Sequence, residues 1–177
     1  MKYLILYLFT LLFFLTACQN TSDKQPNDPA NLKTTVAFFS DTTKMDTFKV
    51  VLQGKKPKDM LLTFNIVTGN GKEIYKKVFK ASDLINNYQE TLDLSKEKSQ
   101  RDFIQQEFNL FLEEENFLWP ALTPEQKPDR QSPDLAFFKE LQDSQLNGFQ
   151  YRLTKETKVY IAWSGKHQQV KIYYKCC

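Results

Sequence analysis

The stretch that decides the fold is MLLTFNIVTGNGKEIYKKV, residues 60–78. Apolar and polar residues alternate in its first half, which places every second side chain on one face of a β-strand. The residues expected to face inward are Leu62, Phe64 and Ile66. Asn70 and Gly71 follow, and this pair supplies the positive φ angles of a tight hairpin turn. Because Ile74 and Val78 resume an apolar pattern after the turn, the stretch predicts an antiparallel β-hairpin.

The same alternation occurs upstream of the hairpin and again near the C-terminus. Upstream, TFKVVLQ (residues 47–53) predicts a strand that completes a three-strand meander within residues 46–80, with Phe48, Val50 and Leu52 inward. Near the C-terminus a second meander is predicted, with inward residues Phe149, Tyr151 and Leu153, then Val159, Ile161 and Trp163, then Val170, Ile172 and Tyr174. Such one-sided alternation indicates an antiparallel sheet with one covered face and one face in water.

Between the two meanders, residues 82–146 follow a helical period. A short helix is expected from Ser82 to Asn87, and a longer one over residues 99–115 with Ile104, Phe108, Phe111 and Leu112 on one stripe. Ser132 is expected to cap a further helix that begins at Pro133 and is stopped by Gly148. Its inward residues would be Leu135, Phe138, Leu141 and Leu146. The sequence therefore predicts an α+β domain: one antiparallel sheet of about six strands with two main helices packed on it.

Charge is distributed unevenly along the chain. The formal net charge is only +3, but residues 46–81 and 148–177 are basic, whereas residues 82–147 are acidic. Five residues of the second meander are expected to form an outward basic and aromatic face: Arg152, Tyr160, Lys171, Tyr173 and Lys175. Such a face could bind an anionic glycan, lipopolysaccharide, a membrane surface or an acidic protein. The alternative is an ordinary solvated sheet whose lysines prevent edge-to-edge pairing.

Motifs for enzymatic chemistry are scarce. His167 is the only histidine and falls in an expected turn, no metal-ligand spacing occurs, and five glycines hardly allow a phosphate-binding loop, so no cofactor is expected. The run from Glu113 to Glu115 is expected to be a solvated helix end, because adjacent helical side chains diverge by about 100°. A hydrolase that places carboxylates such as Glu107 and Asp102 in a cleft between helices and sheet is the alternative to a non-enzymatic binding module.

The N-terminus has the features of a secretory signal. A lysine at position 2 precedes an apolar run from Tyr3 to Leu15, whose thirteen residues would span about 20 Å as a helix, less than the ~30 Å of a bilayer core. Leu15-Thr16-Ala17-Cys18 resembles the lipobox of bacterial lipoproteins. The resemblance covers about the first eighteen residues and implies cleavage before Cys18, whose thiol would carry the lipid, with palmitate-like acyl chains as the anchor. An ordinary signal peptide followed by a chance cysteine is the alternative.

These features predict the organisation and location of the chain. Residues 1–17 would be the signal peptide, residues 18–35 the lipidated cysteine and a flexible tether, and residues 36–177 a single α+β domain. The lipoprotein resemblance implies that an Asp directly after the cysteine would keep the protein in the inner membrane. Because Gln19 stands there, the outer membrane is expected, with the domain facing the periplasm or the cell surface. The expected partners are the membrane, through the lipid, and an envelope protein or anionic glycan, but not nucleic acid. A purely structural assembly lipoprotein is a third hypothesis.

Cys176 and Cys177 end the chain. Export would place both thiols in an oxidising compartment, and with Cys18 lipidated no third cysteine remains to pair with either. Three arrangements remain open: a strained vicinal disulfide, an intermolecular bridge, or two thiols of which one packs under the last strand.

Overall fold

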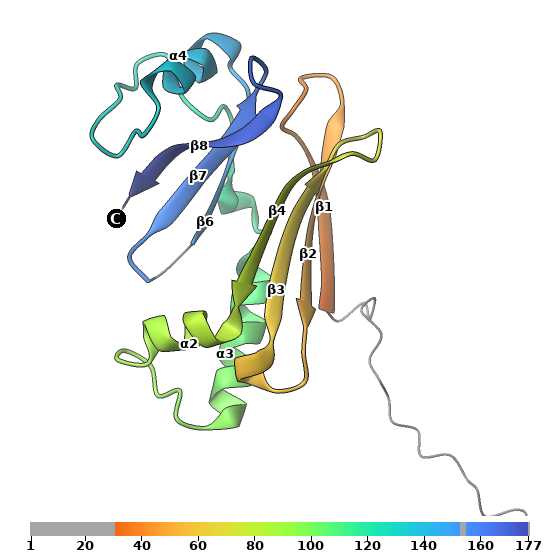
Figure 1. Cartoon of the computed structure of the whole chain (residues 1–177), viewed down its shortest axis with the longest axis vertical. Helices are drawn as coiled ribbons and strands as arrows, with labels where there is room; N and C mark the ends of the chain where they lie inside the picture. Colours follow the sequence, from red (N-terminus) through yellow and green to blue (C-terminus); the bar gives the residue numbers. More distant parts are fainter. Residues whose placement is uncertain (1–30, 153–154, 177) are drawn as a thin grey trace, which may run out of the picture.

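The structure of the chain, a computed structural model, describes residues 31–152 and 155–176. Within these residues lie two four-stranded antiparallel sheets and three α-helices (Figure 1). The expected α+β class is confirmed, but the strands form two sheets, not one sheet of six. The expectations for residues 1–30, Leu153 and Cys177 fall outside the described residues.

The first sheet contains the predicted hairpin and meander in sequence order: β1 (Leu32–Phe38), β2 (Met45–Gln53), β3 (Leu61–Val67) and β4 (Glu73–Lys80). The hairpin turn is confirmed, because Gly71 has a φ of 87° and its N–H donates to the Thr68 carbonyl at 2.8 Å. Strand β1 was not expected. The tether was predicted to extend to residue 35, but residues 32–35 pair with β2. An edge strand that buries few side chains carries little alternation, and only Ala37 of β1 is buried.

The second sheet consists of β5 (Phe117–Leu118), β6 (Gly148–Arg152), β7 (Lys158–Ser164) and β8 (Gln169–Cys176), again in sequence order. It packs against the first sheet through aromatic rings. The Phe149 ring lies 5.2 Å from that of Phe48 and 5.1 Å from that of Phe64, measured between ring centroids. The alternating residues of the two meanders therefore bury one another, which is why the strands stay in separate sheets.

Three helices pack against the sheets and contribute side chains to two hydrophobic clusters. Helices α2 (Ala81–Tyr88) and α3 (Glu97–Leu110) contribute Leu84, Ile85, Phe103, Ile104 and Phe108 to the core between the sheets. Figure 1 shows this pair beside one end of the first sheet, and α4 (Leu135–Ser144) beside the second sheet. Helix α4 packs on the outer face of the second sheet, where Phe137, Phe138 and Leu141 form a smaller cluster with Ala162 and Tyr173.

The ends of the helices differ from the expected ones. Helix α3 ends at Leu110 rather than residue 115, because the amide of Asn116 donates to the carbonyls of Leu110 and Phe111 at 3.0 and 3.1 Å. Helix α4 is capped by Asp134, whose carboxylate accepts from the Phe137 N–H at 2.9 Å, and not by Ser132. The chain leaves α4 at Gln145, with a φ of 54°.

Two register shifts change which side chains of the last strand in each meander face inward. In the first sheet the pairing shifts between Ile66 and Val67, so Phe79 is buried while Val78 is 44% exposed. In the second sheet the pairing shifts at Tyr173, so Tyr174 pairs with Tyr160 and shares the outer face with it, whereas Ile172 still pairs with Ile161 but is 41% exposed. A bulge adds one residue to one strand and moves every later side chain to the other face. The expectation that Val78 and Tyr174 face inward is therefore wrong, and Ile172 is not buried as expected. Tyr173 faces outward as expected, but it is buried there under α4 and the loop of residues 119–134.

Candidate functional site

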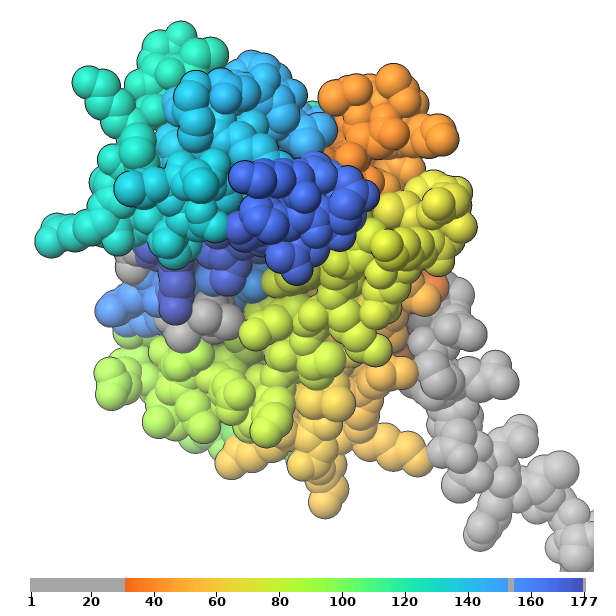
Figure 2. Space-filling model, turned by 45° about the horizontal axis from the view of Figure 1, so that its top comes forward, coloured from red at the N-terminus to blue at the C-terminus, as the bar shows by residue number. Residues whose placement is uncertain are grey.

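The expected basic and aromatic face of the second meander is largely covered. Helix α4 and the loop of residues 119–134 pack on it, and the buried Tyr173 hydroxyl donates to the Ala121 carbonyl at 3.1 Å. In Figure 2 the cyan and teal atoms of these segments lie against the dark-blue C-terminal strand. Periodicity indicated two faces for the sheet, but it did not indicate that a helix from the middle of the chain would cover the second one.

The five residues predicted for that face do not form one accessible surface. The Lys171 ammonium pairs with Asp134, holds the pKa of that carboxyl below its usual value, and lies 5.1 Å from the centroid of the Phe137 ring. Arg152 donates to the Tyr88 hydroxyl at 2.6 Å, on the other side of the sheet. The Tyr160 ring packs against those of Tyr173 and Tyr174. Lys175 is exposed on β8, as are Gln169 and Ile172.

The Cys176 thiol is half-buried and lies 4.0 Å from the Tyr160 hydroxyl. The side chain therefore lies against β7, the neighbouring strand, as expected for the packed-thiol arrangement. The bonding of the pair stays a prediction, because Cys177 lies outside the described residues.

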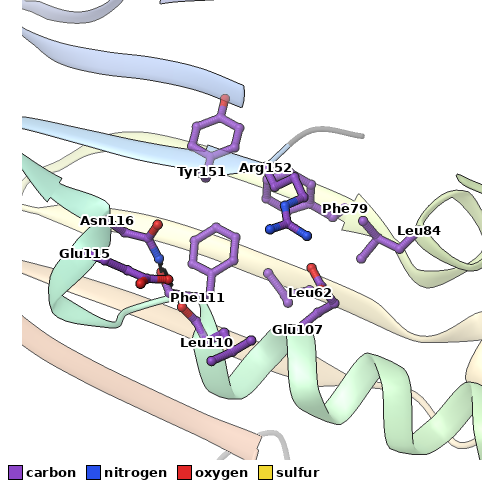
Figure 3. A pocket seen from close by; sticks show the side chains of 10 residues that line it. All are labelled: Leu62, Phe79, Leu84, Glu107, Leu110, Phe111, Glu115, Asn116, Tyr151 and Arg152. Atoms are coloured by element: carbon purple, nitrogen blue, oxygen red, sulfur yellow. Dashed lines mark hydrogen bonds between the residues drawn. The ribbon is translucent and has the colours of Figure 1, made fainter. Parts of the chain in front are cut away.

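A cleft lies between α3 and the two sheets, where the hydrolase hypothesis placed its carboxylates. Figure 3 shows the Glu107 carboxylate directed toward the Arg152 guanidinium across this cleft, whose volume is about 80 Å³. Burial raises the pKa of Glu107, and the charge of Arg152 opposes that shift. Tyr151 also lines the cleft. Its hydroxyl is hydrogen-bonded to that of Tyr75 at 2.7 Å, and burial raises the pKa of Tyr151 above its usual value.

This cleft does not assemble a pair of catalytic carboxylates. Asp102, the expected partner of Glu107, has a 61% exposed side chain that pairs with Lys98 on the outside of α3. The second carboxylate of the cleft belongs to Glu115, and Figure 3 shows the Phe111 ring between it and Glu107. The volume is also well below the ~300 Å³ at which small-molecule sites begin. The geometry fits a half-buried glutamate that faces an exposed arginine more closely than a substrate site.

His167 lies beside a serine and a glutamate, but the arrangement is that of a turn. The Ser164 hydroxyl is 3.0 Å from His167 Nδ1, accepts from the His167 N–H at 3.1 Å, and donates to the Glu140 carboxylate at 2.9 Å. In a catalytic triad the acid orients the histidine, whereas Glu140 bonds to the serine. Ser164 is also fully buried, so its hydroxyl cannot reach a substrate.

A different surface collects exposed apolar side chains beside β1. Val36, Trp119 and Leu110 are 58%, 54% and 46% exposed. Two adjoining hollows lie here, and together we call them the β1 groove. The smaller, of about 210 Å³, is lined by Thr35, Val36, Ala37, Leu112, Glu114, Phe117 and Trp119. The larger and more open one, of about 680 Å³, is lined by Leu110, Glu113, Glu114, Glu115, Phe117 and Trp119.

The walls of the β1 groove are fixed by the core behind them. The Trp119 ring stacks on Phe117 at 5.9 Å, and Phe117 packs in turn against Phe48 and Phe149 at 5.0 and 4.9 Å. The acidic side is held by backbone and side-chain bonds: Gln150 donates to the Glu115 carbonyl at 2.8 Å, and Lys33 pairs with Glu113 at 3.1 Å. A rigid hollow with an exposed indole is therefore present before any ligand arrives.

Sequence patterns did not indicate the β1 groove. It joins residues 35–37 to residues 110–119, which lie far apart in the sequence, and neither segment has a clean period. The acidic run at Glu113 was expected to be a solvated helix end. The one available signal was Trp119, a tryptophan that lies outside any apolar stripe and close to the acidic run of residues 113–115.

Comparison with known proteins gives no independent guide to function. No protein family model, curated protein or solved structure matches the chain. Within the described residues, no helix is long and apolar enough to cross a membrane. The same residues contain no group of three or more His, Cys, Asp or Glu side chains placed to hold a metal ion.

Proposed function

We propose that this chain is a lipid-anchored binding module of the bacterial envelope, which holds a partner protein on the β1 groove. The observation that carries this proposal is the exposed apolar surface of Val36, Leu110 and Trp119 around a preformed hollow. Clustered apolar side chains rimmed by charges are typical of protein interaction sites, and tryptophan is enriched among the residues that dominate binding energy.

The anchor in this proposal is the lipid on Cys18, which rests on the lipobox resemblance of residues 15–18. Strand β1 begins at Leu32, fourteen residues after Cys18 (32 − 18 = 14). Fourteen residues extend to at most about 50 Å, so the anchor would keep the β1 groove near the membrane surface. A partner in the same membrane, or in the layer next to it, would thus be held at high local concentration. The proposed membrane is the outer one.

A protein partner is favoured over an anionic glycan by the charge of this surface. The face first expected to bind anions is covered by α4, and the β1 groove carries Glu113, Glu114 and Glu115 on its rim. Carboxylates repel phosphate and sulfate groups and attract basic side chains. A non-enzymatic role is favoured by the small cleft at Glu107 and by the buried Ser164.

The proposal predicts that the protein migrates as part of a complex when mild detergent extracts it from its native membranes. Trp119→Asp combined with Val36→Asp should return it to the size of the isolated chain, since a charge placed in an apolar contact is costly to desolvate. The matched control is Leu135→Asp, because Leu135 is 62% exposed on α4, away from the groove. Native gel electrophoresis of the three extracts is the measurement.

The anchor is tested in the same strain. Cys18→Ala should move the protein from the membrane pellet to the soluble fraction, because removing the acyl chains removes about 0.8 kcal/mol for each buried methylene. Membrane attachment that survives this change would contradict the lipid anchor. Migration of the unaltered protein at the size of a single chain, in every mild detergent, would contradict the partner.

A further inference from the structure

We propose that the partner contributes an extended, basic segment, which adds as a fifth strand to the open edge of β1 and lays its apolar side chains into the β1 groove. This inference rests on the proposed function and specifies how the partner is held. Three independent features of the described residues point to it: the chemistry of the edge, the charge of the rim and the shape of the smaller hollow.

The first feature is the edge itself. Strand β1 pairs with β2 on one side only, so half of its backbone N–H and C=O groups face away from the sheet. Natural proteins protect such edges with lysines, prolines or bulges. The first sheet does this at its other edge, where β4 carries Lys76, Lys77 and Lys80. In β1 the central residues are Thr34, Thr35 and Val36, and the pairing with β2 continues without a bulge from Leu32 to Phe38.

The single lysine of β1 does not protect the edge, because it is engaged elsewhere. Lys33 donates to the Asn109 carbonyl and pairs with Glu113 at 3.1 Å. These contacts tie the start of β1 to the end of α3. At the other end of β1 the Phe38 carbonyl accepts from the Asn147 amide at 2.9 Å. The open edge therefore runs from Thr34 to Ala37, a regular, uncharged strand next to an apolar hollow, which is the arrangement used to bind peptides by strand addition.

The second feature is the acidic rim. Glu113, Glu114 and Glu115 line the larger hollow, and Glu114 lines both hollows. Lys33 neutralises only Glu113, and Arg152 lies near Glu115 at the cleft. In the part of the chain that the structure describes, no ion pair involves Glu114. A bound strand that directs a lysine or arginine toward these carboxylates would supply the missing positive charge beside Glu114.

The third feature is the smaller hollow, which accepts side chains from one face of an added strand. Its walls are the edge residues Thr35 to Ala37 on one side and Leu112, Phe117 and Trp119 on the other. Every second side chain of a strand points to the same face, so alternate residues of the bound segment would meet the indole ring. A volume of about 210 Å³ suits an aliphatic or aromatic side chain. The face of the segment toward the β1 groove is therefore expected to carry apolar residues, with a basic residue on the same face where the strand passes Glu114.

A second copy of this chain fits the site less well than a basic partner. Its β1 would offer Lys33 as the only positive charge, and Lys33 already pairs with Glu113 of its own chain. Two such edges together would leave both acidic rims without counter-charges. Self-association through β1 is therefore one of the outcomes that would overturn the proposal.

The experiment uses the full chain in detergent and three synthetic peptides. The probe is the octapeptide Thr-Lys-Thr-Val-Thr-Phe-Thr-Lys with blocked ends, in which the lysine, valine and phenylalanine side chains share one face of the strand. The second peptide replaces each lysine by glutamate, and the third keeps the probe sequence but methylates every second backbone nitrogen on the hydrogen-bonding side. Binding is measured by fluorescence anisotropy at low and at physiological salt. Hydrogen exchange of residues 32–38 is followed with each peptide.

The probe should bind, and its affinity should fall as the salt concentration rises. It should also slow the hydrogen exchange of the amides in β1. The glutamate peptide should bind at least about tenfold more weakly because of repulsion at the rim, and the methylated peptide likewise because it cannot donate to the edge. The double substitution Glu114→Lys and Glu115→Lys should also lower the affinity for the probe about tenfold. Glu125→Lys, on the loop over the second sheet, is the matched control and should leave its affinity unchanged.

Equal affinity for the probe and its methylated form, or unchanged exchange in β1, would overturn strand addition. Equal affinity for the glutamate peptide would overturn the basic partner, and a dimer that forms without peptide and is broken by Val36→Asp would show a second copy in its place. These failures differ from a failure of the proposed function. In that case the extracted protein carries no partner at all, whatever the peptides do.

Discussion

Phe64→Ala is expected to lower the free energy of unfolding by about 3–5 kcal/mol, the largest loss for any single side chain of the core. The Phe64 ring is fully buried and makes five aromatic contacts. Those rings belong to Phe48 of β2, Tyr75 of β4, Phe111 after α3, and Phe149 and Tyr151 of β6. Truncation would leave a cavity where both sheets and the end of α3 meet. Because domains of this size are stable by about 5–15 kcal/mol, the variant should be close to unfolding.

Urea unfolding followed by circular dichroism measures this loss. Val78→Ala is the control, because its side chain is 44% exposed and its loss should stay within about 0.5 kcal/mol. A loss below about 1 kcal/mol for Phe64→Ala would contradict a shared core between the two sheets. A loss for Val78→Ala as large as that for Phe64→Ala would contradict the register shift in the first sheet.

Gly148→Ala is expected to destabilise the protein by about 1–3 kcal/mol, although it adds only a methyl group. A Cβ atom at this position would lie 2.9 Å from the Tyr173 hydroxyl and 3.0 Å from the Ala121 Cβ atom. Ala121 belongs to the loop that covers the outer face of the second sheet, and Tyr173 lies on that face in β8. Crowding at Gly148 would thus push the loop of residues 119–134 away from the sheet.

The control for this second prediction is Gly165→Ala, where the nearest atom would be a Glu140 oxygen at 3.9 Å. That substitution should change stability by less than about 0.5 kcal/mol. In a Tyr173→Phe background, the cost of Gly148→Ala should shrink, since the closest contact is gone. Strictly additive losses in this double-mutant cycle would contradict the close packing of Tyr173 against Gly148.

The strands and their core residues could be predicted where a local pattern alone decides them. Phe48, Phe64 and Ile161 face inward as expected, because each lies in a regular alternation that only one register can bury. The burial of Tyr173 could not be predicted, because α4 and the loop of residues 119–134 cover the outer face on which it lies, and no local pattern marks that cover. Strand β1 was missed because an edge strand needs few buried residues.

Contacts between elements that lie far apart in the sequence could not be predicted. The two meanders were expected to form one sheet, since periodicity reports which face is apolar but not which element covers it. Gly148 was expected to end a helix, yet its lack of a side chain serves the close approach of Ala121 and Tyr173. Ser132 was expected as the cap of α4, but Asp134 provides the bond.

The candidate site was the least predictable part. The face of Arg152, Lys171 and Tyr173 satisfied every local criterion and is nevertheless covered or split by packing. The β1 groove depends on Val36 meeting Trp119 across more than eighty residues (119 − 36 = 83), and only tertiary structure brings them together. The N-terminal prediction differs in kind, because a processing signal is read as a sequence and needs no fold.

The proposal that a partner docks on the β1 groove is tested most directly by photo-crosslinking in intact cells. A photoreactive amino acid would replace Val36, Trp119, or the control residue Leu135 on α4. We predict the same heavier adduct from positions 36 and 119, its absence from position 135, and its loss when Glu114→Lys and Glu115→Lys are added. No adduct from positions 36 and 119, or an identical set of adducts from all three positions, would contradict a partner site on the β1 groove.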